Sequence, residues 1–221
     1  MVNTLKNIHV ISGYSNSFVL EFDDYLILID CGFDKKAKEI IKKIKKVGKN
    51  LRYIFITHSH IDHIYGLYEI FRKFPSAKIV AHKNSEKYLV GKEFKLPKGI
   101  KGFVFKFFVY FLNYRGFKPH IKIYNEIEEL NGIKAIYTPG HTEDHVCYLV
   151  ADKLFIGDLI INKKGLSLAP KEYNDSEIEI KKSIEKLLKL DFNEIYFGHG
   201  ETLSTNAKIE LENFYKKLYY Y

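Results

Sequence analysis

Short β-branched runs alternate with amphipathic helical patterns along this 221-residue chain. Residues 16–22 and 25–30 flank Asp23-Asp24, which predicts two antiparallel strands joined by a tight turn. Apolar residues then recur at helical spacing over 37–47, with lysines on the other face and Gly48 as a stop signal. Strands that form hairpins and are interspersed with helices favour a mixed α/β sandwich over a doubly wound parallel sheet.

The same reasoning extends to the rest of the chain, except residues 92–122, which follow no clean period. We expect the remaining strands at residues 51–57, 78–81, 134–138, 145–150, 153–156 and 194–197, and helices at 64–71, 85–90, 176–190 and from about 205.

Four potential metal donors lie within six residues, on the loop between a predicted strand and the next helix. They are His58, His60, Asp62 and His63. Side chains on such loops converge on pockets, and a tight set of imidazoles gains little from burial without a partner. This density therefore predicts a metal site.

Three further donors follow predicted strand ends downstream, each beside a glycine: His141, Asp158 and His199. Imidazoles combined with carboxylates indicate a catalytic transition metal. Seven donors are more than one tetrahedral ion needs.

The ordered pattern His-x-His-x-Asp-His, then a single His, an Asp and a final His resembles the metallo-β-lactamase superfamily over roughly residues 10–200. The resemblance implies a four-layer αββα sandwich, taken here as a single domain over residues 1–221. It also implies that Asp30 is a buried residue that orients a metal-bound histidine. The implied ligands are His58, His60 and His141 for the first metal, Asp62, His63 and His199 for the second, and Asp158 as the bridge.

That ligand set implies two Zn²⁺ per chain, with iron or manganese as other possible metals. A hydroxide bridging both ions would be the nucleophile, and Asp62 would be the catalytic residue that orients it or accepts its proton. Substrate-binding residues are unknown at this stage.

Individual residues of the motif indicate which reactions of the superfamily are expected. Asp158 stands at the bridging position rather than Cys, and His63 follows Asp62, which argues against antibiotic hydrolysis. The chain most resembles the glyoxalase II-like group, which implies a small-molecule thioester, lactone or ester substrate. Glu143 and Asp144 replace the family's frequent Pro-Gly and add negative charge, which disfavours acidic substrates. Alternatives are a phosphodiesterase or nuclease, a mononuclear-iron sulfur dioxygenase, and a metal-binding protein without catalysis.

Positive charge concentrates in residues 35–52 and 92–122. The first segment is explained by a solvated helix face. The second is a basic, aromatic insert, and it is the one feature that favours nucleic acid, although we expect none to bind. Its apolar run 103–112 is too short to span a bilayer. It is interpreted as core or homodimer packing, with a lid over the metals or attachment to a membrane surface as alternatives.

Only two cysteines occur, Cys31 and Cys147. Each lies in apolar, strand-like sequence, so we expect buried free thiols. No secretory leader is recognisable and no segment could span a membrane, so a cytoplasmic location is expected.

Overall fold

The computed structural model describes residues 4–220. They separate into two compact units, here called the N-terminal unit (described over residues 4–123) and the C-terminal unit (described over residues 124–220). Both units combine a sheet with helices, so the prediction of a mixed α/β fold is confirmed. No helix within residues 4–220 is long and apolar enough to cross a membrane.

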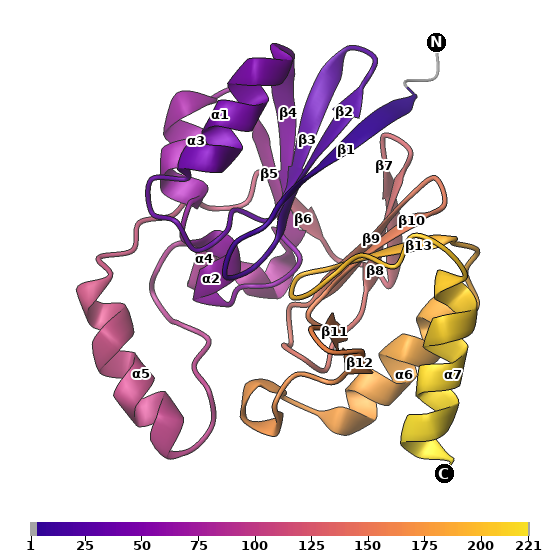
Figure 1. Cartoon of the computed structure of the whole chain (residues 1–221). Helices are drawn as coiled ribbons and strands as arrows, with labels where there is room; N and C mark the ends of the chain where they lie inside the picture. The colour runs from indigo at the N-terminus through magenta and orange to yellow at the C-terminus, as the bar shows by residue number, and fades with distance from the viewer. Residues whose placement is uncertain (1–3, 221) are drawn as a thin grey trace. The chain divides into compact units, whose positions relative to one another are not determined.

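The N-terminal unit is built on a six-stranded sheet in sequential order. Its first three strands are antiparallel and its last three run parallel to their neighbours, because chain crossovers replace hairpins after the third strand. The strands are β1 (Leu5–Ile11), β2 (Ser17–Phe22), β3 (Tyr25–Ile29), β4 (Asn50–Phe55), β5 (Lys78–His82) and β6 (Ile121–Ile123), shown in Figure 1.

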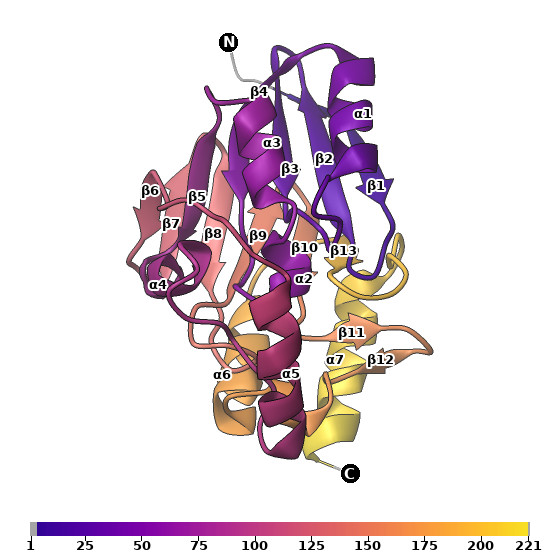
Figure 2. The ribbon, with the colours of Figure 1, turned by 90° about the vertical axis from the view of Figure 1, so that its left-hand side faces the viewer.

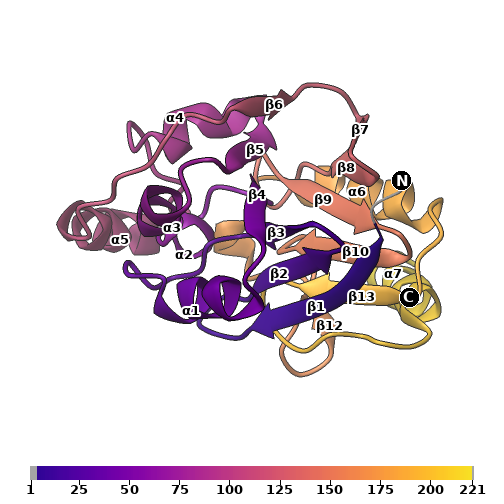
Figure 3. The ribbon, with the colours of Figure 1, turned by 90° about the horizontal axis from the view of Figure 1, so that it is seen from above.

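Two helices, α1 (Lys38–Val47) and α3 (Leu67–Lys73), pack on one face of this sheet, as Figure 3 shows from above. Ile40 and Ile44 of α1 are buried in the same core cluster as the sheet residues, which explains the helical apolar spacing. The predicted helix at 64–71 is instead two helices, because α2 (Ile61–Ile64) ends before Gly66. A Cβ at Gly66 would lie 2.3 Å from the backbone oxygen of Cys31, so only glycine fits where the chain turns into α3.

Residues 92–122 contain a helix that the sequence pattern did not predict, α5 (Ile100–Phe111). It follows a short helical segment made of a 3₁₀ turn (Lys83–Ser85) and α4 (Glu86–Leu89). The interpretation of residues 103–112 as core packing is wrong for most of their side chains. Val109 is buried, whereas Phe107 is 59% exposed and Tyr110 is 80% exposed.

The C-terminal unit has a five-stranded sheet whose antiparallel meander ends in a parallel pairing of β10 with β13. Helices α6 (Glu177–Leu188) and α7 (Ala207–Tyr219) lie side by side in Figure 1 and pack with the strands in one core cluster; Figure 2 shows the same unit turned by 90°. The strands are β7 (Ile127–Leu130), β8 (Ile133–Tyr137), β9 (Val146–Val150), β10 (Lys153–Gly157) and β13 (Glu194–Phe197), with a small ribbon of β11 (Ile161–Asn162) and β12 (Leu166–Ser167) and a 3₁₀ turn at Lys171–Tyr173.

Candidate metal centre

The histidine run lies where β4 gives way to α2. His58 follows the strand, His60 is the residue before the first turn of α2, and Asp62 and His63 belong to that helix. The three histidines are buried, and Asp62 is half-buried. The predicted position on a strand-to-helix connection is therefore correct, with two of the four donors carried by the helix itself.

Asp30, directly after β3, accepts three hydrogen bonds beneath this run. Its Oδ1 accepts from the Thr57 backbone N–H at 2.8 Å, and its Oδ2 accepts from the Thr57 hydroxyl at 2.7 Å. Oδ2 also lies 2.9 Å from Nδ1 of His63. The Asp30 side chain is fully buried, and a carboxylate in such a place needs these donors.

This arrangement determines which ring nitrogens carry protons. Because an ionised Asp30 can only accept, His63 must donate from Nδ1, which leaves its Nε2 unprotonated. The Thr57 hydroxyl gives its one proton to Asp30, so its oxygen must accept from Nδ1 of His58, 3.0 Å away. Both histidines thus present Nε2 as the bare nitrogen, the form that binds metals.

The spacing of these atoms fits a metal ion. His60 Nδ1 donates a hydrogen bond to the unprotonated His58 Nε2, and the two nitrogens are 3.1 Å apart. Two nitrogens at zinc distance in a tetrahedral site would be separated by about 3.3 Å. Ligand atoms of His58 and His63 lie within 4.8 Å of each other, and Asp62 Oδ2 is 3.7 Å from His63 Nε2. The donors in the N-terminal unit therefore suit a transition metal.

The backbone at Asp30 adopts the left-handed conformation, with φ 57°. Two backbone bonds hold the turn, since the Asp30 N–H donates to Phe55 and the Cys31 N–H donates to the His63 carbonyl at 2.7 Å. Asp and Asn tolerate this conformation better than most residues. Burial and the charge of Asp30 raise the pKa of the Cys31 thiol well above its usual value, so this thiol stays protonated.

The C-terminal unit carries the other three predicted donors on loops that follow β8, β10 and β13. His199 Nδ1 lies 2.9 Å from both carboxylate oxygens of Asp158. His141 Nε2 is 3.9 Å from the nearer Asp158 oxygen. All three side chains are buried, so His141, Asp158 and His199 form one cluster within this unit.

Asn174 orients His141, a role that sequence reasoning missed. The Asn174 amide donates from Nδ2 to the Ala169 carbonyl at 2.8 Å, so its Oδ1 faces His141 Nδ1 at 2.9 Å. His141 therefore donates from Nδ1 and presents Nε2 as the bare nitrogen, as His58 and His63 do. Asn174 lies 33 residues from His141 in a polar stretch, and nothing in that spacing singles it out.

His145 is a second missed residue. Its Nε2 accepts a hydrogen bond from the Asp158 backbone N–H at 3.3 Å, and its Nδ1 lies 2.9 Å from the Thr138 hydroxyl. These bonds tie the turn that carries Asp158 to the start of β9. The available sequence signal was a second histidine four residues after His141.

Two glycines let the C-terminal loops adopt their paths. Gly140 has φ 134°, and a Cβ there would lie 2.4 Å from the Ile180 backbone nitrogen. Gly200 has φ 105°, and a Cβ there would lie 2.0 Å from the Asn162 carbonyl oxygen. Because His141 and His199 adjoin these glycines, a side chain at either position would displace a candidate ligand.

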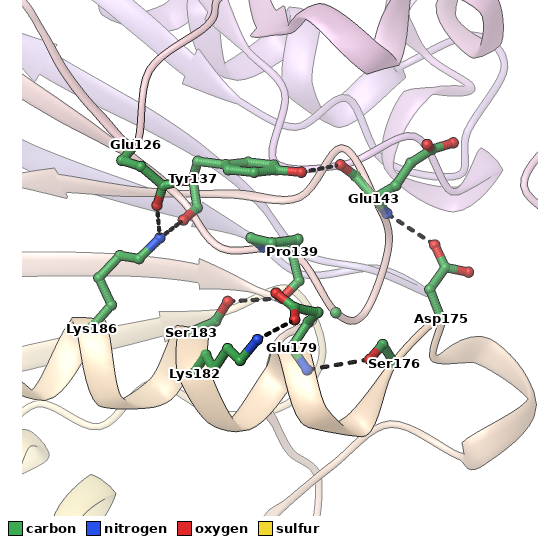
Figure 4. Close-up of a pocket in the computed structure, with 11 residues that line it drawn as sticks. Glu126, Tyr137, Pro139, Glu143, Asp175, Ser176, Glu179, Lys182, Ser183 and Lys186 are labelled. Carbon is green, nitrogen blue, oxygen red and sulfur yellow. Dashed lines mark hydrogen bonds and ion pairs between the residues drawn. The ribbon is translucent and has the colours of Figure 1, made fainter.

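A pocket of about 520 Å³ lies beside the His141 loop within the C-terminal unit (Figure 4). Ser183 of α6 donates to the Pro139 carbonyl at 2.7 Å, and the Tyr137 hydroxyl donates to the Glu143 carbonyl at 2.9 Å. Lys186 pairs with Glu126 and donates to the Tyr137 carbonyl. Burial, followed by the charges of Glu126 and Glu143, raises the pKa of Tyr137. These contacts fasten the His141 loop to α6.

The family model of the metallo-beta-lactamase superfamily matches residues 11–199, a span that contains all seven predicted donors. The chain belongs to this superfamily. The predicted family is thus confirmed, whereas the metal-binding role of each residue stays a prediction.

Curated relatives carry one recurring name. Hydroxyacylglutathione hydrolase 1 of Vibrio vulnificus is 29% identical over 178 residues, which cover 80% of this chain and 58% of that protein. Hydroxyacylglutathione hydrolase of Buchnera aphidicola is 28% identical, covering 87% of this chain and 62% of that protein. The chain spans about three fifths of the length of these relatives.

Solved structures show the same fold. An archaeal metallo-beta-lactamase superfamily protein from Sulfolobus tokodaii matches with a TM-score of 0.68 at 23% identity, covering 97% of this chain and 87% of that one. A metallo-beta-lactamase from Hirschia baltica matches with a TM-score of 0.68 at 16% identity, covering 95% of this chain and 97% of that one. These likenesses agree with the fold class expected from the sequence.

Proposed function

We propose that this protein is a metal-dependent hydrolase that uses two metal ions, most suitably zinc. The proposal rests on the histidines His58 and His63. Hydrogen bonds to Thr57 and Asp30 keep the ring proton of each on Nδ1, so that Nε2 is the unprotonated nitrogen. Superfamily membership over a span containing every donor supports it. In this proposal His58, His60 and His141 hold one ion, Asp62, His63 and His199 hold the other, and Asp158 is shared by both.

When bound, a pair of such ions supplies a water of low pKa and polarises a carbonyl oxygen. Asp62 is the residue of this chain to which we assign a part in that chemistry. The Asp62 carboxylate is half-buried on α2, and its backbone carbonyl accepts a hydrogen bond from Ser15 at 2.5 Å. We assign Asp62 the role of orienting the attacking water and accepting its proton.

The proposed substrate class is a small thioester, lactone or carboxylic ester. It is supported by the relatives, whose name, hydroxyacylglutathione hydrolase, denotes hydrolysis of an acyl conjugate of glutathione. Glu143 and Asp144, two and three residues after His141, place acidic groups beside that ligand, which disfavours substrates with a negative charge near the scissile bond.

The test combines metal analysis with activity. Purified protein reconstituted with zinc should retain two equivalents per chain and hydrolyse a thioester panel faster than bis-nitrophenyl phosphate. Replacing Asp158 with Ala should remove turnover, with a loss on the order of 100-fold or more. Asp191→Ala is the matched control, because the Asp191 side chain is fully exposed.

Three outcomes contradict the proposal. Full activity in the Asp158→Ala variant would rule out a shared bridging carboxylate. Retention of one iron with oxygen consumption would indicate a dioxygenase. Preference for the phosphodiester would indicate phosphoryl chemistry.

A further inference from the structure

Helix α5 (Ile100–Phe111) exposes an unusual amount of apolar surface. Five aromatic and two aliphatic side chains on it are between 46% and 85% exposed. With 150–250 Å² for a typical aromatic side chain, they present roughly 900 Å² in total, more than the largest apolar patch of a typical soluble monomer. They are Ile100, Phe103, Val104, Phe107, Phe108, Tyr110 and Phe111.

These seven side chains lie on one face of the helix. At about 100° per residue they occupy an arc of about 160°, which runs from Tyr110 through Ile100 to Phe108. Lys101 lies at one edge of this arc, beside Phe108, and Lys106 lies at the other edge, beside Tyr110. The exposed apolar arc is thus bordered by lysines on both sides.

The opposite face of α5 attaches the helix to the N-terminal unit. Gly102 and Val109 are buried, and Phe105 and Leu112 pack against the core cluster of that unit. Gly102 allows a close approach, since a Cβ there would lie 1.9 Å from the Pro97 carbonyl oxygen. The inner face of α5 therefore packs against the N-terminal unit, while the side chains of the outer arc are exposed.

Charge favours one occupant for the outer arc. Residues 92–122 contain eight Lys and Arg residues against one acid, Glu93. A second copy of α5 would bring its own Lys101 and Lys106 close to those of the first copy, and the one acid of the segment, Glu93, already pairs with Lys87. An anionic lipid surface instead complements the lysines, while its acyl region accepts the aromatic side chains between them.

We propose that the outer arc of α5 docks this protein onto the surface of a membrane rich in anionic phospholipid. The helix lies in the plane of the headgroups with its aromatic side chains inserted and Lys101 and Lys106 reaching back to the phosphates. Docking of this kind needs no metal, so it stands or falls separately from the proposed hydrolase activity.

The chain contains no tryptophan, so a single introduced one reports on its own surroundings. In Phe107→Trp, the full-length protein should show a blue-shifted emission when mixed with vesicles of equal parts phosphatidylglycerol and phosphatidylcholine. Pure phosphatidylcholine vesicles should give a much smaller shift, and added salt should reduce it. Ile178→Trp on α6 is the matched control, because Ile178 is 70% exposed and belongs to the other unit.

Two sets of substitutions separate the apolar and the basic contributions in vesicle co-sedimentation. Replacing Phe103, Phe107 and Phe111 with Ser should lower the bound fraction at least about tenfold, since each removes an inserted ring. Lys101→Gln and Lys106→Gln should each lower the affinity for anionic vesicles about fivefold. All these side chains are exposed, and unchanged circular dichroism and thermal unfolding would confirm that the variants fold.

The proposal is overturned by unshifted Phe107→Trp emission with anionic vesicles, or by an equal shift in the Ile178→Trp control. A blue shift that grows with protein concentration in the absence of vesicles, together with a dimer mass by light scattering, would overturn it in favour of a second copy.

Discussion

Asp30→Asn is the perturbation that tests the candidate centre most directly. All three groups bonded to the Asp30 carboxylate are donors: the Thr57 N–H, the Thr57 hydroxyl and His63 Nδ1. An amide offers one oxygen and one NH₂ group, so at least one buried donor must face another donor. Asn keeps the volume of Asp and tolerates φ 57°, so backbone strain adds little.

The expected magnitude follows from these bonds. One orphaned buried donor costs about 1–3 kcal/mol, and two further bonds lose their charge-assisted part. The free energy of unfolding of the metal-free protein should therefore fall by about 3 kcal/mol. Zinc affinity should fall about 10–100-fold, because His63 no longer has a carboxylate to hold its Nδ1 proton and can present a protonated Nε2 instead.

Two measurements check this prediction. Urea denaturation in the presence of EDTA gives the change in stability, and competition with a chromophoric chelator gives the zinc affinity. Asp191→Asn serves as the control, since its exposed contact with Lys208 should contribute less than about 0.5 kcal/mol. If Asp30→Asn leaves both quantities at wild-type values, the proton assignment for His58 and His63 is refuted.

Three further predictions concern stability. Gly200→Ala should lower the free energy of unfolding, measured by urea denaturation, by more than about 2 kcal/mol and should lower zinc retention, because its Cβ would clash with Asn162. The control Gly48→Ala, with φ 79° and no atom within 4 Å of the added Cβ, should lower it by only about 1 kcal/mol. Burial raises the pKa of Cys147 to about 12, whereas the unfolded thiol has a pKa near 9, so between these values only the unfolded state loses the proton. From pH 9 to 12 the free energy of unfolding, measured by urea denaturation, should therefore fall about 1.4 kcal/mol per pH unit more steeply in wild type than in Cys147→Ala. Zinc at about 100 times its dissociation constant should raise the free energy of unfolding by about 2.7 kcal/mol over the EDTA-treated protein, and an unchanged midpoint would contradict metal binding by the folded state.

Much of the fold was predictable because local and global signals agree. The Asp23-Asp24 turn joins β2 to β3, and the apolar spacing up to Val47 belongs to α1, which ends with Gly48 in the left-handed conformation. In these elements the buried face has the period of the secondary structure, so periodicity alone identifies them. The two thiols are also free and buried, as predicted.

The elements that were missed lack such a period. β1 (Leu5–Ile11) is a half-exposed edge strand, and β7 (Ile127–Leu130), at the edge of the other sheet, has no fully buried residue. Edge strands bury little, so their sequences carry a weak pattern. α5 carries apolar side chains on its exposed face as well as on its buried face. Its sequence therefore lacks the alternation of apolar and polar residues that reveals an amphipathic helix.

The candidate site shows a different limit. The candidate donors His58 to His63 stood out in the sequence because they lie within one short segment, but the residues that orient the candidate histidines are distant in sequence. Asp30 reaches His63 across 33 residues, and Asn174 reaches His141 across the same separation. Only the fold brings such pairs together, and a family resemblance could point to Asp30 but not to Asn174.

These two orienting residues treat their histidines differently. Asp30 is a carboxylate that fixes the Nδ1 proton of His63 directly and that of His58 through Thr57, so it raises the electron density on both Nε2 atoms. Asn174 is neutral and fixes the tautomer of His141 without adding charge. Within the N-terminal unit, His58 and His63 therefore present the more electron-rich Nε2 atoms, whereas the C-terminal unit places its buried carboxylate, Asp158, beside His199.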